Sequence, residues 1–261
     1  MKRICVVIPM FNKADLTDRC VEMTVANAGI ECDILVVDDG SEIPYENGSI
    51  NVLRLNENSG FTNATNQGIL WCSDRYEFIH LLNNDTEPEP NFISTLLDVM
   101  DNNSSIGIAS SSRIHNEADG SFACIENYGL DLVRGHQLIS RTNLPDDVIF
   151  IDWLPTCSAL MRLEMIREIG LLDKQFRNHC SDSEYCIRAN MNQWNVALVP
   201  KSRVLHHWSL TTSENKINPS EDQNKFIAKL AGLKYAELMK RVPLDCEQKT
   251  YGSLQFMTYN K

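Results

Sequence analysis

The sequence predicts an α/β protein with a doubly wound, mostly parallel central sheet that carries helices on both faces. Two observations support this fold class. Short runs of β-branched residues alternate with helical patterns through the first half of the chain, and a similar alternation returns after residue 150. Strand–helix–strand repetition is typical of a parallel sheet, which binds its ligands beyond the carboxyl ends of the strands.

The elements of the first half follow from the spacing of their apolar residues. β-branched and aliphatic residues fill the expected strands, whereas the expected helices repeat apolar residues every three or four positions. In chain order we expect strand Ile4–Ile8, helix Leu16–Ala26, strand Ile34–Val37, strand Asn51–Leu55, helix Asn63–Trp71, strand Phe78–Leu82, helix Phe92–Met100 and strand Ile106–Ser110.

The second half is less regular. Residues 113–150 are polar and punctuated by glycine, and we expect hairpins around Gly120 and Gly135. The run SALMR then predicts a strand, and LEMIREIG predicts a helix that ends at Gly170. Beyond it we expect helix Asp182–Met191, strand Val196–Val199 and strand Val204–His207.

The tail from Ser220 to Arg241 has an amphipathic helical pattern. Its apolar side carries Phe226, Leu230, Leu233 and Leu238, with lysines around them. We expect a helix that docks on the domain or at a homodimer interface. A membrane surface is disfavoured because the chain is acidic and no Trp flanks the helix.

Composition narrows the functional classes. The chain has 24 Lys and Arg against 35 Asp and Glu, and its net charge of −11 disfavours a nucleic-acid partner. Its nine cysteines include no CxxC pair, which argues against a disulfide framework or a structural zinc site. No apolar run reaches the roughly 20 residues of a transmembrane segment, and Asn12 interrupts the start too early for a signal peptide. We therefore expect a cytoplasmic protein.

Polar clusters follow three of the predicted strands. They are Pro9–Asn12, Asp38–Ser41 and Asn83–Asp85. One such cluster could simply form a turn, because Asp, Asn, Gly and Ser are common turn residues. Three clusters at corresponding strand ends would meet at one edge of the sheet, so we expect a ligand site there.

The motifs at these positions resemble glycosyltransferase family 2, whose members have the GT-A fold. The resemblance runs from Ile4 to about Ser209 and rests on VVIPMFN, ILVVDDGS, NENSGFTNATNQGI, LLNNDTEPEPNFI and the block from DWLPTCSALM through REIGLLD and SDSEYCIRA to VPKSRVLHH. It implies an inverting enzyme that uses Mn²⁺ or Mg²⁺ to move a sugar from a nucleoside-diphosphate-sugar to a hydroxyl acceptor such as a glycan.

The resemblance also implies a division of the chain. A GT-A domain over residues 1–212 would have a nucleotide-binding half, 1–112, and an acceptor and catalytic half, 113–212. Residues 213–261 would form a C-terminal helical extension.

Donor contacts are implied for three stretches. In this family the first two loops hold the nucleoside, and the stretch before and within the next helix lies beside the donor. For that third stretch, a glycine turn followed by a helix with amides facing water is nearly as good an interpretation. The candidate donor residues are Pro9, Phe11, Asn12, Asp38, Asp39, Gly60, Asn63, Asn66, Asn83 and Asn84.

The run LNNDT stands where the family carries its metal-binding D-x-D motif. The resemblance implies that Asp85 is a metal ligand and that Asn83 replaces the first carboxylate, as in relatives resembling rhamnosyl- and galactofuranosyltransferases. His206 or His207 would complete the metal shell, and the family's usual spacing favours His206. Imidazole binds Mn²⁺ more readily than Mg²⁺.

The family also places an acidic pair at the start of a later helix, and its second member is the general base. Here the pair is Ser181–Asp182, which implies Asp182 as the base with Glu184 in reserve. From the sequence alone, Asp182 would be interpreted as a helix cap. Trp153 stands where an aromatic residue lines the acceptor cleft, although a core Trp competes with this assignment. Thr156 replaces a small residue nearby.

Two other functions compete with this interpretation. A nucleotidyltransferase would need a basic, Gly-rich loop after the first strand, and PMFNKAD does not have that composition. An inactive nucleotide-sugar-binding module is favoured by the missing first acid in both motifs.

Overall fold

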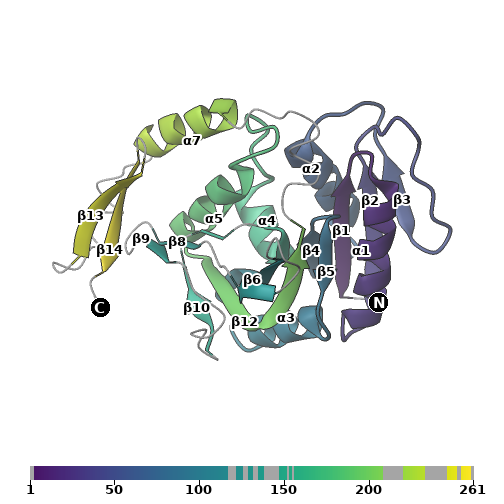
Figure 1. Ribbon diagram of the computed structural model, residues 1–261, viewed down its shortest axis with the longest axis horizontal. Coiled ribbons are helices and arrows are strands. Elements are labelled where there is room, and N and C mark those ends of the chain that lie inside the picture. The colour runs from purple at the N-terminus through teal and green to yellow at the C-terminus, as the bar shows by residue number, and fades with distance from the viewer. Residues whose placement is uncertain are drawn as a thin grey trace.

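The computed structural model describes residues 3–116, 122–125, 129–131, 135–137, 147–151, 153–154, 156–207, 220–232, 246–251 and 254–259. Its main sheet consists of β1 (Ile4–Met10), β2 (Asp33–Asp38), β3 (Asn51–Arg54), β4 (Phe78–Leu82), β5 (Thr86–Pro88), β6 (Ile106–Asn116), β7 (Phe122–Ile125), β10 (Ile149–Phe150), β11 (Ser158–Arg162) and β12 (Asn195–His206). The helices are α1 (Ala14–Asn27), α2 (Phe61–Cys72), α3 (Phe92–Asp101), α4 (Leu163–Ile169), α5 (Ser181–Met191) and α7 (Ser220–Gly232) (Figure 1).

The order of the strands confirms the predicted fold class. The main path is β10-β12-β6-β11-β4-β1-β2-β3, with β5 beside β12 and β7 beside β6. The four strands β4, β1, β2 and β3 are parallel, as are β6 and β12, whereas β11 runs antiparallel between β4 and β6. The carboxyl ends of β1, β2 and β4 therefore meet at one edge, where the predicted polar clusters lie.

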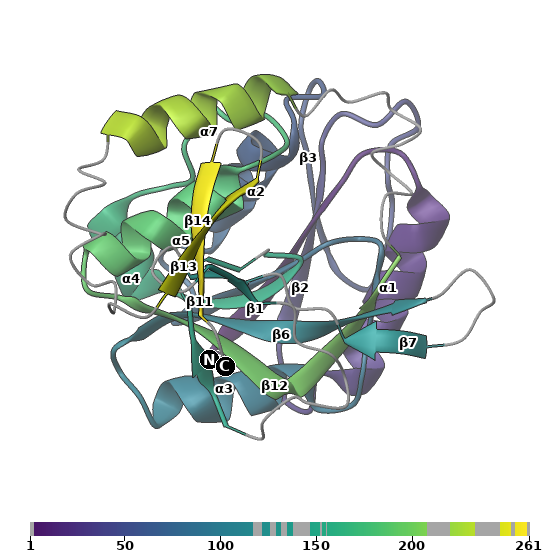
Figure 2. The same cartoon turned by 60° about the vertical axis from the view of Figure 1, so that its left-hand side comes forward.

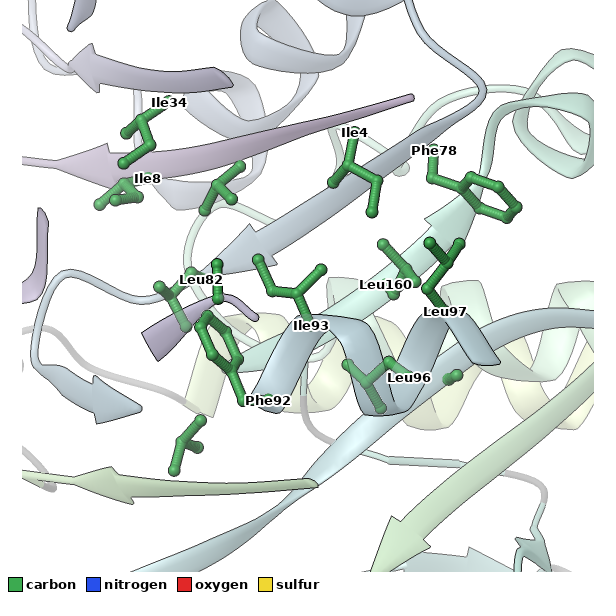
Figure 3. Close-up of a cluster of buried hydrophobic side chains, with 14 of the residues drawn as sticks. Ile4, Ile8, Ile34, Phe78, Leu82, Phe92, Ile93, Leu96, Leu97 and Leu160 are labelled. Atoms are coloured by element: carbon green, nitrogen blue, oxygen red, sulfur yellow. The ribbon is translucent and has the colours of Figure 1, made fainter. Parts of the chain in front are cut away.

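Helices cover both faces of the sheet. On one face, a buried cluster joins α1 and α3 to the side of the sheet that carries Ile4, Val6 and Ile8. On the other, a second cluster joins α2, α4 and α5 to the side that carries Cys5 and Val7. Successive residues of a strand point to opposite faces, so a strand covered on both sides needs a continuous apolar run, as β1 has. Figure 3 shows the first face, where the apolar side of α3 lies against side chains of the strands.

Two strand predictions are corrected. The two strands expected at 196–199 and 204–207 form the single strand β12, which continues through an irregularity between Val199 and Arg203. The sequence also did not predict β5, which forms because Thr86–Pro88 pairs antiparallel with the end of β12. Such a short strand has no periodicity of its own and depends on its partner.

The less regular regions follow the predictions in part. Strands β6 and β7 pair antiparallel on either side of Gly120, and β8 (Gly129–Asp131) pairs with β9 (Gly135–Gln137). The tail helix α7 ends at Gly232, so Leu233 and Leu238 lie outside the described residues. The extension is not wholly helical, because β13 (Cys246–Tyr251) and β14 (Leu254–Tyr259) form a hairpin. Within the described parts of the chain, no helix is long and apolar enough to span a membrane.

Candidate active site

The loops after β1 and β2 are joined by Asn12. The backbone N–H of Asn12 donates to Ser41 Oγ at 2.8 Å, and its side-chain oxygen accepts the N–H of Glu42 at 3.0 Å. Asn12 and the next residue both adopt left-handed backbone angles, which turns the chain sharply out of β1. Pro9 is buried within β1 and Phe11 is half-buried at the turn. Asn12 therefore shapes the predicted nucleoside loops, with its side-chain oxygen committed to the second loop.

Asp38 organises the second loop from within. It is 0% exposed, and its carboxylate accepts the backbone N–H groups of Ser41 at 2.8 Å and Tyr45 at 3.0 Å and pairs with Arg54. Burial by itself would raise the pKa of Asp38, but these hydrogen bonds outweigh burial and hold the pKa below its usual value. The predicted direct contact between Asp38 and the nucleoside does not fit this burial.

Asp39 fastens the second loop to the segment before α2. Its carboxylate, 3% exposed, accepts four hydrogen bonds: from the Asn58 amide, from the N–H and hydroxyl of Ser59, and from the N–H of Gly60, at 2.6–3.1 Å. Four bonds fill the usual acceptor capacity of a carboxylate. Asp39 therefore acts here as a brace between loops, and a nucleoside would have to displace one of these donors.

The space beside the α-carbon of Gly60 is occupied by Arg177. The φ of Gly60, 92°, is strained for other residues, and a Cβ there would lie 2.5 Å from Cγ of Arg177. The expected close approach at this glycine is thus to the loop between α4 and α5.

Asn63 and Asn66, expected on one polar face, have different surroundings. Asn63 donates to Ser59 Oγ at 2.8 Å and lines a cavity of about 460 Å³. Asn66 is 0% exposed and holds the backbone of Leu172 from both sides, donating to its carbonyl at 2.8 Å and accepting its N–H at 3.0 Å. Asn66 therefore has a structural role in this fold, and its contact with the donor stays a prediction.

The loop after β4 carries the predicted metal motif. The N–H of Asn83 donates to the carbonyl of Cys157 at 2.9 Å, which ties this loop to the segment before β11. The Asn83 side chain is half-buried, whereas the Asn84 side chain is buried and donates to Thr17 of α1 at 3.1 Å. The Asn84 side chain therefore faces α1, and its assignment to the donor stays a prediction.

Asp85 and His206 face each other. Nε2 of His206 lies 3.2 Å from Oδ1 of Asp85, and their side chains are 12% and 8% exposed. Nε2 of His207 lies 3.1 Å from Glu87 instead. The pairing of β5 with β12 places His206 opposite Thr86, and successive strand residues point to opposite sides. Of the two histidines, His206 is thus the one beside Asp85. Among the described residues, no group of three or more His, Cys, Asp and Glu side chains is placed to hold a metal.

Asp182 lies in the first turn of α5 but does not cap the helix. The N-cap position is Cys180, which has a left-handed backbone and no capping hydrogen bond. Asp182 Oδ1 accepts the N–H of Ser183 at 2.8 Å, and the backbone N–H of Thr156 also donates to this carboxylate. Burial raises the pKa of Asp182 above its usual value, against the opposing effect of these hydrogen bonds.

Glu184 has a different environment two residues later. It is 3% exposed, and its carboxylate pairs with Arg188 at 2.9 Å and with Lys229 of α7 at 3.0 Å. Because residues two apart on a helix point in nearly opposite directions, Glu184 and Asp182 face different sides of α5. The two cations already engage Glu184, which makes it a poor reserve base.

The thiol of Cys157 lies near both Asp85 and Asp182. Burial raises the pKa of Cys157, Arg113 lowers it, and Asp85 and Asp182 raise it, so that the pKa is about 11. All three charges are therefore within electrostatic reach of Cys157. The sequence did not single out Arg113, a buried residue of β6, although an arginine directly after three serines in a strand is a detectable signal.

Trp153, the predicted acceptor residue, lies on the same segment. It is half-buried, and its indole Nε1 is buried without a hydrogen-bond partner in the described residues. Thr156 is buried and links this segment to Asp182. Thr156 and Cys157 thus lie between the metal loop and the start of α5.

The sheet and the helices on both of its faces define a protein of the GT-A fold class. The model of the family "Glycosyl transferase family 2" matches residues 5–168, which is more than half of the chain, and the chain belongs to this family. A comparison with curated proteins found no match.

A solved structure shows the same fold. It is described as a crystal structure of GalNAc-T7 with UDP, GalNAc and Mn²⁺, and it matches with a TM-score of 0.64 and 15% identity. The match covers 92% of this chain and 54% of that one, so the chain spans about half the length of that protein.

Proposed function

We propose that the protein is an inverting glycosyltransferase that moves one sugar from a nucleoside-diphosphate-sugar to a hydroxyl acceptor. The observation that carries this proposal is that residues 156 and 157 join two predicted groups at the carboxyl edge of the sheet. Cys157 accepts the N–H of Asn83 in the metal loop, where His206 lies beside Asp85, and Thr156 donates to Asp182. Family membership supports the reaction class, and the UDP, GalNAc and Mn²⁺ of the GalNAc-T7 structure support the kind of donor and ion.

The pair Asp85–His206 fits a divalent cation. Oδ1 of Asp85 and Nε2 of His206 lie 3.2 Å apart, so both atoms could contact the same cation. A carboxylate oxygen and an imidazole nitrogen are suitable ligands for Mn²⁺, and Mg²⁺ is the alternative. Two protein ligands leave positions for diphosphate oxygens and water, and the bound ion would neutralise charge on the leaving diphosphate. Because Asn83 contributes no charge, we expect strong binding of the ion only with the nucleotide.

Asp182 would act as the general base on the acceptor hydroxyl. Its carboxylate is oriented by the N–H groups of Ser183 and Thr156, which leaves the remaining lone pairs for the acceptor proton. A raised pKa suits this role, because a base is most effective when its pKa approaches the working pH. Attack from the face opposite the leaving group would invert the anomeric configuration.

Only some of the predicted site residues are exposed enough to be proposed as direct contacts of donor and acceptor. The proposed donor contacts are three half-buried residues: Phe11 and Asn83 on their loops, and Asn63 in the first turn of α2. Trp153 is the proposed acceptor contact. Pro9, Asn12 and Asp39 would shape the nucleoside pocket through the loops that they hold.

The proposed division of the chain keeps residues 1–212 as the GT-A domain and 213–261 as an extension. The sheet itself is shared by the halves 1–112 and 113–212, because β11 lies between β4 and β6. Dimerisation through the tail helix stays a prediction. The second candidate function is an inactive nucleotide-sugar-binding module, favoured by Asn83 and Ser181 at the two positions where the family carries acids.

Binding and transfer assays separate these functions. We would first measure the melting temperature with UDP-, GDP-, dTDP- and CDP-sugars, each with and without Mn²⁺, because a ligand of the native state raises stability by mass action. Hydrolysis of the stabilising donor, and transfer to hydroxyl acceptors, would then be followed. Stabilisation without any turnover would indicate the inactive module, and no stabilisation by any nucleotide sugar would refute the proposed function.

A further inference from the structure

The tail helix α7 is anchored to the loop that leads into α5. In Figures 1 and 2, α7 lies alongside the α5 side of the molecule. The carboxylate of Asp222, 6% exposed, accepts three consecutive backbone N–H groups, from Arg177 at 3.1 Å and from Asn178 and His179 at 2.9 Å. Burial would raise the pKa of Asp222, but these bonds hold it below its usual value. The carboxylate is therefore charged at neutral pH, and each bond is charge-assisted.

Lys229 of α7 makes a second contact, with both ends of the segment that leads from α4 into α5. Nζ of Lys229 lies 2.5 Å from Asp173, just after α4, and 3.0 Å from Glu184, in the first turns of α5. One lysine thus bridges two acids that are eleven residues apart in the sequence. With Asp222 in the middle, α7 fixes the start, centre and end of the segment 173–184.

Among the described side chains of α7, polar groups make most of the contacts with this loop. Phe226 meets Phe176 edge to face, with ring centroids 6.4 Å apart, and Lys225 donates to the carbonyl of Gln175 at 2.9 Å. Between α7 and the start of α2 lies the cavity of about 460 Å³, so the helix is not packed flush against the domain. Removal of one polar anchor should therefore loosen the loop while the Phe226–Phe176 contact and the other anchor stay in place.

The domain holds the other side of this loop. The N–H of Phe61 donates to the Asn178 side chain at 3.1 Å, and the N–H of Thr62 donates to the carbonyl of Arg177 at 3.1 Å. The loop is thus hydrogen-bonded to the start of α2 on one side and to α7 on the other. It then turns at Cys180 into α5, where Asp182 is the second residue.

We propose that α7 is a clamp that positions Asp182 for catalysis, with Asp222 as its main positioning residue. The inference rests on the proposed function of Asp182 as base. It adds the tail helix to the active unit, beyond the proposed GT-A domain of residues 1–212. Asp222 would act by fixing the backbone at 177–179 and hence the start of α5.

The test compares Asp222→Asn with Glu221→Gln in the full-length protein. The neighbour Glu221 is exposed and pairs with Lys225, so its variant removes the same charge without touching the loop. We expect Asp222→Asn to lower kcat roughly ten- to hundredfold, because a displacement of about 1 Å can have an effect of this size. The donor Kd should stay within about twofold, and Asp222→Glu should restore part of kcat. Hydrogen exchange of the 177–179 amides should accelerate in Asp222→Asn and stay unchanged in Glu221→Gln.

A second variant tests the clamp independently, in case Asp222→Asn fails to fold. Lys229→Met removes the bridge between Asp173 and Glu184 but leaves Asp222 in place, and it should also lower kcat with donor Kd unchanged. Wild-type kcat in a folded Asp222→Asn protein would overturn the clamp, whatever the exchange rates. A wild-type protein that binds donor but transfers to no acceptor would instead refute the proposed function, and the clamp with it.

Discussion

Replacement of Asp182 by Asn tests the proposed base directly. Asn has nearly the same shape, and its side-chain oxygen can still accept the N–H groups of Ser183 and Thr156. It cannot take a proton from the acceptor at neutral pH. Loss of a positioned general base should lower the transfer rate about 10²–10⁴-fold, while donor affinity stays within about twofold.

The control is Glu184→Gln, which removes a carboxylate from the same helix. Glu184 is buried against Arg188 and Lys229, both partly exposed, so we expect a loss of about 1–3 kcal/mol in unfolding free energy. Transfer by the folded variant should fall less than tenfold. Rates and donor Kd would be measured side by side, with unfolding in urea as the check on stability. An active Asp182→Asn and an inactive Glu184→Gln would refute the assignment of the base.

The pH dependence of kcat/KM and of folding stability gives an independent test of Asp182. Because burial raises the pKa of Asp182, the folded protein keeps a proton there over a pH window in which the unfolded chain has lost it. Wild-type kcat/KM should therefore rise with pH through this raised pKa. Asp182 should make folding less favourable as pH rises through the same window. Both effects should be absent from Asp182→Asn.

Three further predictions follow from the site. Asp85→Ala should abolish Mn²⁺-dependent nucleotide binding, with a smaller loss in His206→Ala and almost none in His207→Ala; calorimetry that finds the larger loss for His207→Ala would contradict the assignment. Gly60→Ala should lower the free energy of unfolding by about 1–3 kcal/mol, and unchanged urea unfolding would show that the loop adjusts freely. Because the pKa of Asp38 is lowered by folding, its carboxylate should stabilise the fold fully above its ordinary pKa and lose this effect as pH falls through the lowered pKa. Asp38→Asn should therefore weaken the loss of unfolding free energy at acid pH, measured by urea unfolding. An unchanged loss at acid pH would refute Asp38 as its cause.

Local patterns predicted most of the fold. Strand β4 and strand β11 have the bounds that their apolar runs predict, and α4 ends at Gly170 as its glycine indicates. Such elements depend on residues close in the sequence, so a single chain suffices to recognise them. Strand β5 was missed because three residues become a strand only when a distant partner, β12, pairs with them.

The sequence by itself determined the α/β class, the family motifs and the positions of the polar loops, because these depend on short-range spacing. Only the tertiary structure decided which polar groups remain for a ligand. Asp38 and Asn66 carry suitable chemistry, but each is taken up by partners that the fold brings to it, such as Leu172, which lies 106 residues from Asn66. A buried polar group must be paired, and its partner is set by packing at long range. The same packing placed His206 beside Asp85 and turned His207 toward Glu87.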